Sequence, residues 1–312
     1  MRLGRRRTTS AEQADGAVPE PLGTGERALD SARLQLGWVQ SREVRSADRL
    51  QDAEFRVFSQ FGEDGIIQFL TQRVPIECDI FVEFGVQDYR ESNTRFLLEK
   101  DNWRGLIIDA GDAHQAFLES SELGWRHWID AVTAFIDRDN INELISAAGI
   151  SGDIGLLSID IDGNDYWVLE AIEAVSPRLL VVEYNSLFGP EAAITIPYDP
   201  RFDRTAAHAS GLYFGASLAA LTRLAGERGY ALVGSNRAGG NAFFVRRDVI
   251  GQIPELPVAE GYVPSRFRQS RDQSGRLTRV SSHTDQLELI RDLPVVEVVN
   301  GTQLSVAEAL GL

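Results

Sequence analysis

The sequence has very little of several residue types that would point to particular classes of protein. Cys78 is its single cysteine among 312 residues, so no intramolecular disulfide can form and a fold held together by disulfides is excluded. We expect Cys78 to be a small apolar filler rather than a nucleophile. No apolar run is long enough to cross a bilayer. The basic start of the chain is not followed by the apolar region of a signal peptide, so we expect a cytoplasmic protein without a membrane span.

Positive charge is also scarce. The chain has 31 Lys and Arg residues against 46 Asp and Glu residues, for a net charge of −15. This balance argues against a general nucleic-acid binder and against electrostatic binding to anionic membranes, because both need a basic surface. With 43% hydrophobic and 25% charged residues, the composition is that of an ordinary globular protein. Acidic surfaces are common on soluble enzymes, so the charge identifies no partner, and the oligomeric state stays open.

Several catalytic signatures are missing as well. The sequence contains no nucleophile elbow, no phosphate-binding P-loop and no Cys/His spacing typical of a metal site. A dinucleotide-binding fingerprint needs three glycines in the pattern G-x-G-x-x-G. The candidate loop, residues 85–90, reads GVQDYR and has only the first of them. A nicotinamide-dependent oxidoreductase is therefore kept only as an alternative.

Strand and helix signals alternate along the middle of the chain. Apolar runs typical of buried strands occur at residues 81–86, 106–110, 128–133, 155–161 and 179–184, with helical patterns between them. Two further strands, 230–235 and 242–246, are joined by a turn that contains Gly239 and Gly240. This alternation predicts a mostly parallel seven-stranded α/β sheet with an antiparallel hairpin at its edge, a Rossmann-like sandwich.

The pattern also predicts how the chain is divided. Composition shifts and proline-containing stretches separate its parts. Residues 186–211, with three prolines, form a long irregular segment that we expect to shape a ligand pocket as a lid. The predicted parts are a disordered tail at residues 1–26, a helical segment at 27–54, an α/β domain at 55–249 and an extension without a readable role at 250–312.

Acidic side chains recur where the predicted strands end. In open α/β sheets, ligands bind beyond the carboxyl ends of the strands, and the residues at these ends are Glu83, Gly85, Asp109, Asp130, Asp160, Asp162, Glu183 and Asn185. Gly85 would let the backbone approach a ligand closely. The surrounding carboxylates would repel a pyrophosphate, but they suit S-adenosylmethionine, which carries an ammonium and a sulfonium. We count Asp130 among the cofactor-binding candidates.

Asp109 follows Gly85 by 24 positions, the spacing of one helix and one strand. A carboxylate at this position can accept hydrogen bonds from both ribose hydroxyls of a nucleoside. The alternative is an N-cap of the next helix, for which Asp112 is better placed.

Asp160 and Asp162 point the same way on an extended chain, because side chains alternate with a period of two. Paired carboxylates can bind a divalent ion such as Mg²⁺, or one of them can act as a general base. With Glu183 and Asn185 they could complete an oxygen-ligand site, and the metal set considered is Asp160, Glu183 and Asn185. Alternatively, Glu183 forms a buried ion pair with an arginine, either Arg178 or Arg204.

His208 is the histidine that we expect to matter most. It lies in the segment after the fifth strand, and a pKa near 6.5 suits the deprotonation of a hydroxyl group. The alternative is an ordinary surface histidine. The candidate catalytic residues are therefore Asp160, Asp162, Glu183 and His208.

Three stretches resemble the FkbM-type methyltransferase family. They read SQFGED at residues 59–64, FVEFG with SNT, LEK and WRGL between residues 81 and 106, and LSIDIDG with VL and VEYN between residues 157 and 185. Together they cover roughly residues 55–248. The family usually has a glutamate where this chain has Asp162, and residues 86, 87, 89 and 90 are larger than its usual loop residues.

This resemblance implies a class I methyltransferase sheet and a particular chemistry. It implies O-methylation of a hydroxyl on a sugar or another natural product, with S-adenosylmethionine as the cofactor and a small molecule or a glycan as the partner. It also implies cofactor contacts at Glu83, Gly85, Ser92, Asn93 and Asp109. The reaction would be an in-line displacement in which the protein positions the acceptor oxygen near the methyl group. A methyltransferase-like scaffold without catalytic activity remains a further alternative.

Overall fold

The fold is built on a seven-stranded sheet. The computed structural model describes residues 23–312, and the residues before them in the predicted tail lie outside this range. The strand order is β3-β2-β1-β4-β5-β8-β7. The strands are β1 (Ile80–Phe84), β2 (Arg104–Asp109), β3 (Ile129–Thr133), β4 (Gly152–Ile159), β5 (Val175–Glu183), β7 (Tyr230–Ser235) and β8 (Asn241–Arg246).

The first five strands run parallel to one another. β8 lies antiparallel between β5 and β7. This arrangement confirms the predicted class I methyltransferase-like sandwich with its antiparallel edge hairpin. The strand order also reverses direction between β1 and β4, and the carboxyl ends of the strands flanking such a switch point form the ligand crevice of open α/β sheets.

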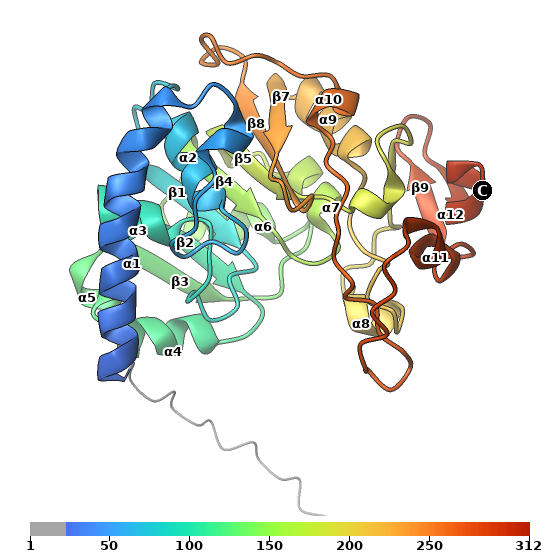
Figure 1. Ribbon diagram of the computed structural model, residues 1–312, viewed down its shortest axis with the longest axis horizontal. Helices are drawn as coiled ribbons and strands as arrows, with labels where there is room; N and C mark the ends of the chain where they lie inside the picture. Colours follow the sequence, from blue (N-terminus) through green and yellow to red (C-terminus); the bar gives the residue numbers. More distant parts are fainter. Residues whose placement is uncertain (1–22) are drawn as a thin grey trace, which may run out of the picture.

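Helices cover both faces of the sheet (Figure 1). One face packs against α6 (Ile141–Ala147), α7 (Asp165–Ala171) and α9 (Leu218–Glu227). The other face packs against α2 (Glu63–Thr71), α3 (Arg95–Asp101) and α4 (Ala113–Ser120). Neighbouring residues on a strand serve opposite faces, as Phe81 and Val82 of β1 do, because side chains alternate along a strand.

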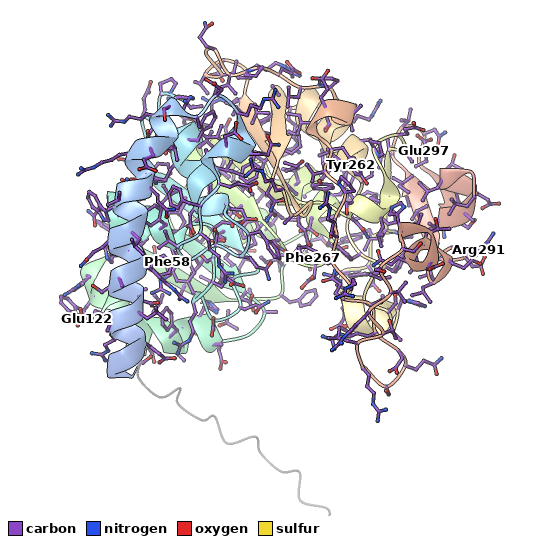
Figure 2. All side chains as sticks on the ribbon, in the orientation of Figure 1. Phe58, Glu122, Tyr262, Phe267, Arg291 and Glu297 are labelled. Atoms are coloured by element: carbon purple, nitrogen blue, oxygen red, sulfur yellow. The ribbon has the colours of Figure 1, made fainter. Side chains whose placement is uncertain are left out.

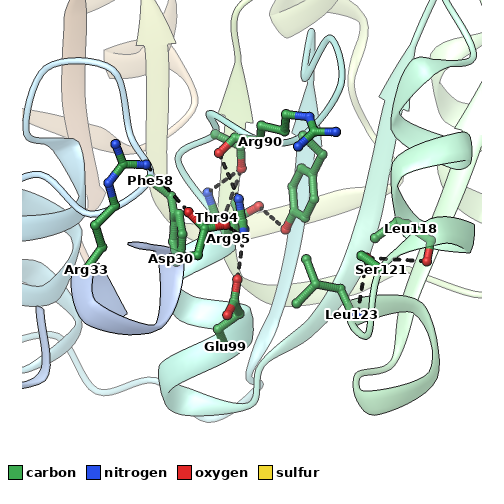
Figure 3. A network of polar contacts seen from close by, with 12 residues as sticks. Asp30, Arg33, Phe58, Arg90, Thr94, Arg95, Glu99, Leu118, Ser121 and Leu123 are labelled. Carbon is green, nitrogen blue, oxygen red and sulfur yellow. Dashed lines mark hydrogen bonds and ion pairs between the residues drawn. The ribbon is translucent and has the colours of Figure 1, made fainter. Parts of the chain in front are cut away.

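Helix α1 (Thr24–Glu43) lies across α2 and α3 (Figure 1). It begins inside the range predicted as a tail, so residues 24–26 are helical. Arg95 of α3 attaches it to the domain, because this buried guanidinium bonds Asp30 of α1 at 2.7 Å and Glu99 at 2.8 Å (Figure 3). Phe58 lies under the same guanidinium, 3.8 Å from it.

The remaining short elements connect these layers. They are η1 (Val44–Ser46), η2 (Leu50–Ala53), α5 (Leu123–Arg126), η3 (Ser186–Phe188), α8 (Arg204–Ala207) and α10 (Val258–Gly261). None of the helices within residues 23–312 is both long and apolar enough to span a membrane.

The C-terminal extension forms a small second sheet. Its order is β10-β9-β6, built from β10 (Thr302–Ser305), β9 (Pro294–Glu297) and the two-residue β6 (Ile194–Thr195). Two helices, α11 (His283–Glu288) and α12 (Val306–Leu310), flank it. β6 belongs to residues 186–211, the segment predicted to be irregular. Apolar side chains of this segment and of the extension pack together in one cluster.

Candidate functional site

Glu83, near the end of β1, holds the loop that follows this strand. This buried carboxylate accepts hydrogen bonds from the Ser92 hydroxyl at 2.9 Å, from the Asn93 amide at 2.8 Å and from the amide and hydroxyl of Thr94. Four donors occupy it. Burial raises its pKa, and these donors oppose the rise. The sequence predicted cofactor contacts for Glu83, Ser92 and Asn93. In the structure, Ser92 and Asn93 instead donate hydrogen bonds to Glu83 and so order the loop.

Gly85 directly follows β1 and lies against Asp160, the residue that directly follows β4. Its φ is +76°, and a Cβ at this position would lie 1.5 Å from the carbonyl oxygen of Asp160. Only glycine allows this approach. Gly85 also lines a cavity of about 180 Å³. The contact between the two strand ends is the reason that this position requires glycine, and the cofactor contact of Gly85 stays a prediction.

Asp109 ends β2 beside the same cavity. Its carboxylate accepts the amide of Gln87 at 2.8 Å and the amide of Gly111 at 2.8 Å. Two bonds leave lone pairs on both oxygens, since a carboxylate offers about four acceptor sites. Asp112, not Asp109, occupies the N-cap of α4, so the N-cap alternative for Asp109 does not hold.

Three carboxylates meet at the ends of β4 and β5. Asp160, Asp162 and Glu183 each offer an oxygen within 4.8 Å of the others. Oε2 of Glu183 is buried and has no hydrogen-bond partner. Burial, followed by the neighbouring carboxylates, raises the pKa of Asp160 and of Glu183 well above their ordinary values. The pair therefore retains a proton at pH values where exposed carboxyls are ionised.

Arg204 faces this cluster from α8. Its guanidinium bonds Asp162 at 2.6 Å and lies 3.6 Å from the ring centroid of Phe214. Asp162 has a φ of +57°, a conformation that is uncommon for a residue other than glycine. The alternative for Glu183, a buried ion pair with Arg178 or Arg204, does not hold, because Arg204 pairs with Asp162 and Arg178 pairs with Asp153.

Asn185 is not free to bind a metal. Its side-chain amide donates to the carbonyls of Leu212 and Phe214, both at 3.0 Å. Its oxygen accepts the amide of Leu187 at 3.1 Å, which caps η3. All of its polar atoms are engaged, so Asp162 replaces Asn185 in the predicted set of oxygen ligands.

Two further predicted residues lie away from the cluster. His208 follows α8 and bonds the Ser210 hydroxyl at 2.8 Å through Nδ1, and it lines neither of the two cavities at this edge. Asp130 is the exposed second residue of β3, so it lies before the carboxyl end of that strand. Neither His208 nor Asp130 therefore lines the candidate site.

A larger cavity of about 500 Å³ adjoins the smaller one. We call the smaller one the nucleoside-side cavity, after the ribose contact that the sequence predicts for Asp109, and the larger one the acidic cavity. Gln87, Asp160 and Asp162 line both. The volume of the acidic cavity is typical of small-molecule sites. The two spaces therefore meet at the carboxylates.

Sequence reasoning missed several residues of these walls. The nucleoside-side cavity is lined by Phe135, a half-exposed aromatic residue just after β3. The acidic cavity is lined by residues of the C-terminal extension, among them Phe267, Arg268 and Gln286. Phe135 could have been found from its position after a strand end. The extension carries no pattern that predicts where it folds back.

Comparison with known proteins gives only distant likenesses. No protein-family model matches the chain, and no curated protein matches it. Among solved structures, it is similar to the pyocyanin biosynthetic protein PhzM, with 14% identity, a TM-score of 0.36, and 59% of this chain aligned to 54% of that chain. An O-methyltransferase family protein from Burkholderia thailandensis gives 13% identity and a TM-score of 0.35, with 77% of this chain aligned to 59% of that one.

The N-terminal domain of EvdMO1, solved with SAH bound, gives 10% identity and a TM-score of 0.38. The alignment covers 68% of this chain and 94% of that domain's chain. The chain thus spans little more than half the length of the first two structures. Likenesses of this strength establish no activity, so the fold assignment rests on the strand order itself.

Proposed function

We propose that the chain is an S-adenosylmethionine-dependent methyltransferase that methylates a hydroxyl group of a sugar, glycan or other natural product. The observation that carries the proposal is the pair of adjoining cavities at the carboxyl edge of the sheet, which share Gln87, Asp160 and Asp162. One space has the features of a nucleoside site, and the other is large enough for an acceptor. A methyl group would pass between them.

The nucleoside-side cavity suits a cationic cofactor. Among the described residues that line it, the charged ones are Asp109, Asp160 and Asp162, all acidic. Asp109 would accept the ribose hydroxyls, and Phe135 would stack on the adenine ring. The sulfonium and the amino group would lie toward Asp160 and Asp162. A dinucleotide would place its pyrophosphate against these carboxylates, which disfavours the oxidoreductase alternative.

The acidic cavity suits deprotonation of a hydroxyl. A carboxylate whose pKa is raised toward the working pH is a better general base than an ordinary one, and Asp160 and Glu183 meet this condition. The acceptor oxygen would attack the methyl carbon as the carbon–sulfur bond breaks. The hydroxyl proton would pass to the carboxylate pair, leaving S-adenosylhomocysteine and a methyl ether.

The carboxylate cluster also fits a divalent cation such as Mg²⁺. Three oxygen ligands lie within 4.8 Å of one another, and Oε2 of Glu183 accepts no hydrogen bond from the protein. Mg²⁺ prefers such ligands and keeps several waters. Asp160, Asp162 and Glu183 would hold it, and when bound it would polarise the acceptor hydroxyl.

Calorimetry tests the cofactor assignment. We expect S-adenosylmethionine to bind and NAD not to bind. The Asp109→Ala variant should weaken binding at least about tenfold, because a hydrogen bond to a charged group contributes roughly 1.5–3 kcal/mol. Asp112→Ala, three residues away and exposed, is the matched control and should bind normally. Binding of NAD alone would overturn the proposal.

Methyl transfer tests the catalytic assignment. Labelled S-adenosylmethionine is offered to a panel of sugars and cell extracts, in the presence of Mg²⁺ or of EDTA. Glu183→Gln should lower the transfer rate at least about a hundredfold, the scale of general base catalysis, while cofactor binding persists. A protein that binds the cofactor but labels no acceptor would favour the non-catalytic scaffold. Equal rates with Mg²⁺ and with EDTA would leave the carboxylate pair as base without a metal.

We also propose that the protein acts in the cytoplasm. Its one cysteine needs no oxidising compartment, and S-adenosylmethionine is a cytosolic cofactor. Fractionation of the source cells tests the location, and recovery of the protein in a membrane or extracellular fraction would contradict it.

A further inference from the structure

A short segment of the C-terminal extension is strongly basic in an otherwise acidic protein. Residues 266–279 contain five arginines and one acidic residue, whereas the whole chain has a net charge of −15. The five are Arg266, Arg268, Arg271, Arg276 and Arg279, and all are exposed. We call this segment the arginine hairpin.

These arginines lack the acidic partners that many other arginines of the described chain have. Ion pairs engage Arg56, Arg95, Arg178, Arg204 and Arg246, but none within residues 23–312 involves the five of the hairpin. Asp272, the acidic residue among them, accepts bonds from Ser274 and from the amide of Arg276. The positive charge is therefore available to a ligand.

The hairpin is held at its base and free at its tip. Phe267 packs on Phe61, with ring centroids 4.7 Å apart, and its label lies near the centre of the view in Figure 2. Gln286 donates to the carbonyl of Phe267 at 3.0 Å. Beyond this point, Arg271 and Leu277 pair across the hairpin, whose loop projects past α8 (Figure 1).

The base of the hairpin is also a wall of the acidic cavity. Arg268, Gln269 and Leu277 line it together with Asp160 and Glu183. The cavity thus has carboxylates where it meets the nucleoside-side cavity and an exposed guanidinium on the hairpin side. Such a field orients a ligand whose two ends differ in charge.

We propose that the acceptor carries a phosphate or diphosphate group, and that the arginine hairpin binds this group while the acceptor hydroxyl reaches the carboxylates. Guanidinium groups bind phosphate oxygens in pairs and with defined geometry. An anion is repelled from Asp160, Asp162 and Glu183 and attracted to Arg268, so the acceptor enters in one orientation only. The inference rests on the proposed function for the identity of the acidic cavity.

Binding of inorganic pyrophosphate to the full chain provides the test, by calorimetry at low and at high salt. We expect binding that weakens with salt, because exposed charges are screened. The double variant Arg266→Gln with Arg268→Gln should bind at least tenfold more weakly, since neither side chain has a partner to lose. Arg223→Gln, which removes an exposed arginine from α9, is the matched control and should bind like wild type.

Hydrogen exchange locates the bound anion. Pyrophosphate should slow exchange in residues 262–280, and binding of S-adenosylmethionine should be unchanged in the double variant. Absence of pyrophosphate binding at millimolar concentration, unchanged binding in the double variant, or protection elsewhere would each overturn the inference. Binding of the hairpin to vesicles of anionic phospholipid without pyrophosphate binding would also overturn it. Failure to bind S-adenosylmethionine would instead reject the proposed function.

Discussion

At the scale of single residues, the site combines groups that are individually unfavourable. Asp160 and Glu183 are carboxyls placed beside each other and beside Asp162, and Asp162 adopts a positive φ. Like charges and strained backbone persist only where the surrounding structure holds them in place. Gly85 contributes to this by letting the two strand ends approach.

The raised pKa values of Asp160 and Glu183 predict how stability depends on pH. The folded state binds their protons more tightly than the unfolded state does. Their stabilising contribution is therefore complete below the ordinary carboxyl pKa and is lost as pH rises through the raised values. Without metal, the free energy of unfolding in urea should be higher at pH 5 than at pH 8.

Asp160→Asn should reduce this difference by at least about 1.4 kcal/mol, the equivalent of one pKa unit. It removes one titrating group and one of the charges that raise the pKa of Glu183. Asp112→Asn, at an exposed position, should leave the difference unchanged. A difference that persists in full in Asp160→Asn would refute the assignment.

Gly85→Ala should lower the free energy of unfolding by at least about 3 kcal/mol, at the upper end of single substitutions. The new Cβ would meet the Asp160 carbonyl at 1.5 Å. Gly149→Ala is the matched control, because Gly149 has a φ of +71° but open space around it. It should lose only about 1–2 kcal/mol, the penalty of the left-handed backbone. Equal losses in urea unfolding would show that the close approach is unimportant.

At the scale of elements, α1 is attached by a buried ion pair rather than by apolar packing alone. Arg95 joins Asp30 of α1 to Glu99 of α3 while lying over Phe58 (Figure 3). Breaking a buried pair leaves uncompensated charge, which is more damaging than losing a surface pair. Arg95 is therefore a main attachment of α1, beside the bond that the Gln72 side chain donates to the carbonyl of Ser41 at 2.8 Å.

Arg95→Met should lower the free energy of unfolding by about 3 kcal/mol, within the range for broken buried pairs. It should also speed hydrogen exchange in α1. Arg33→Met is the matched control, because Arg33 contacts the same Asp30 at 3.5 Å from an exposed position. Its effect should stay below about 0.5 kcal/mol. If both variants exchange alike in α1, the attachment lies elsewhere.

At the scale of the whole molecule, the C-terminal extension is part of the domain. β9 pairs with β6, which lies in the segment between β5 and α9. Its side chains join those of this segment in one apolar cluster, and other residues of the extension line the acidic cavity. We therefore expect one cooperative unfolding transition.

Val295→Ala tests this unity. Val295 is fully buried in β9, and its truncation should lower the free energy of unfolding by about 2 kcal/mol, comparable to other large-to-small core changes. All five tryptophans precede residue 168, so their fluorescence reports mainly on the α/β domain, and Trp167 also bonds the carbonyl of Ile196 at 2.9 Å. The tryptophan transition should shift with the far-ultraviolet transition, whereas the exposed Val299→Ala should shift neither. A shift seen only in the far-ultraviolet signal would mean that the extension unfolds by itself.

The sequence by itself determined the main sheet. Apolar runs of strand length separated by helical patterns specify buried parallel strands, and β1, β2, β4 and β5 lie where these runs predicted them. The sequence also predicted that Asp109, Asp160 and Glu183 lie at one edge of the sheet, because the carboxyl ends of parallel strands meet there. These are local signals, repeated along the chain.

Only the tertiary structure decided which polar groups remain available at that edge. Glu83 and Asn185 stand at strand ends like Asp109 and Glu183, but neighbouring backbone amides and carbonyls engage them. The structure also brought the arginine hairpin to the cavity from a segment without a readable pattern, and it paired Arg204 of the predicted lid segment with Asp162. Hydrogen-bond partners and long-range contacts depend on how distant segments pack, and residue types at fixed spacings do not encode this information.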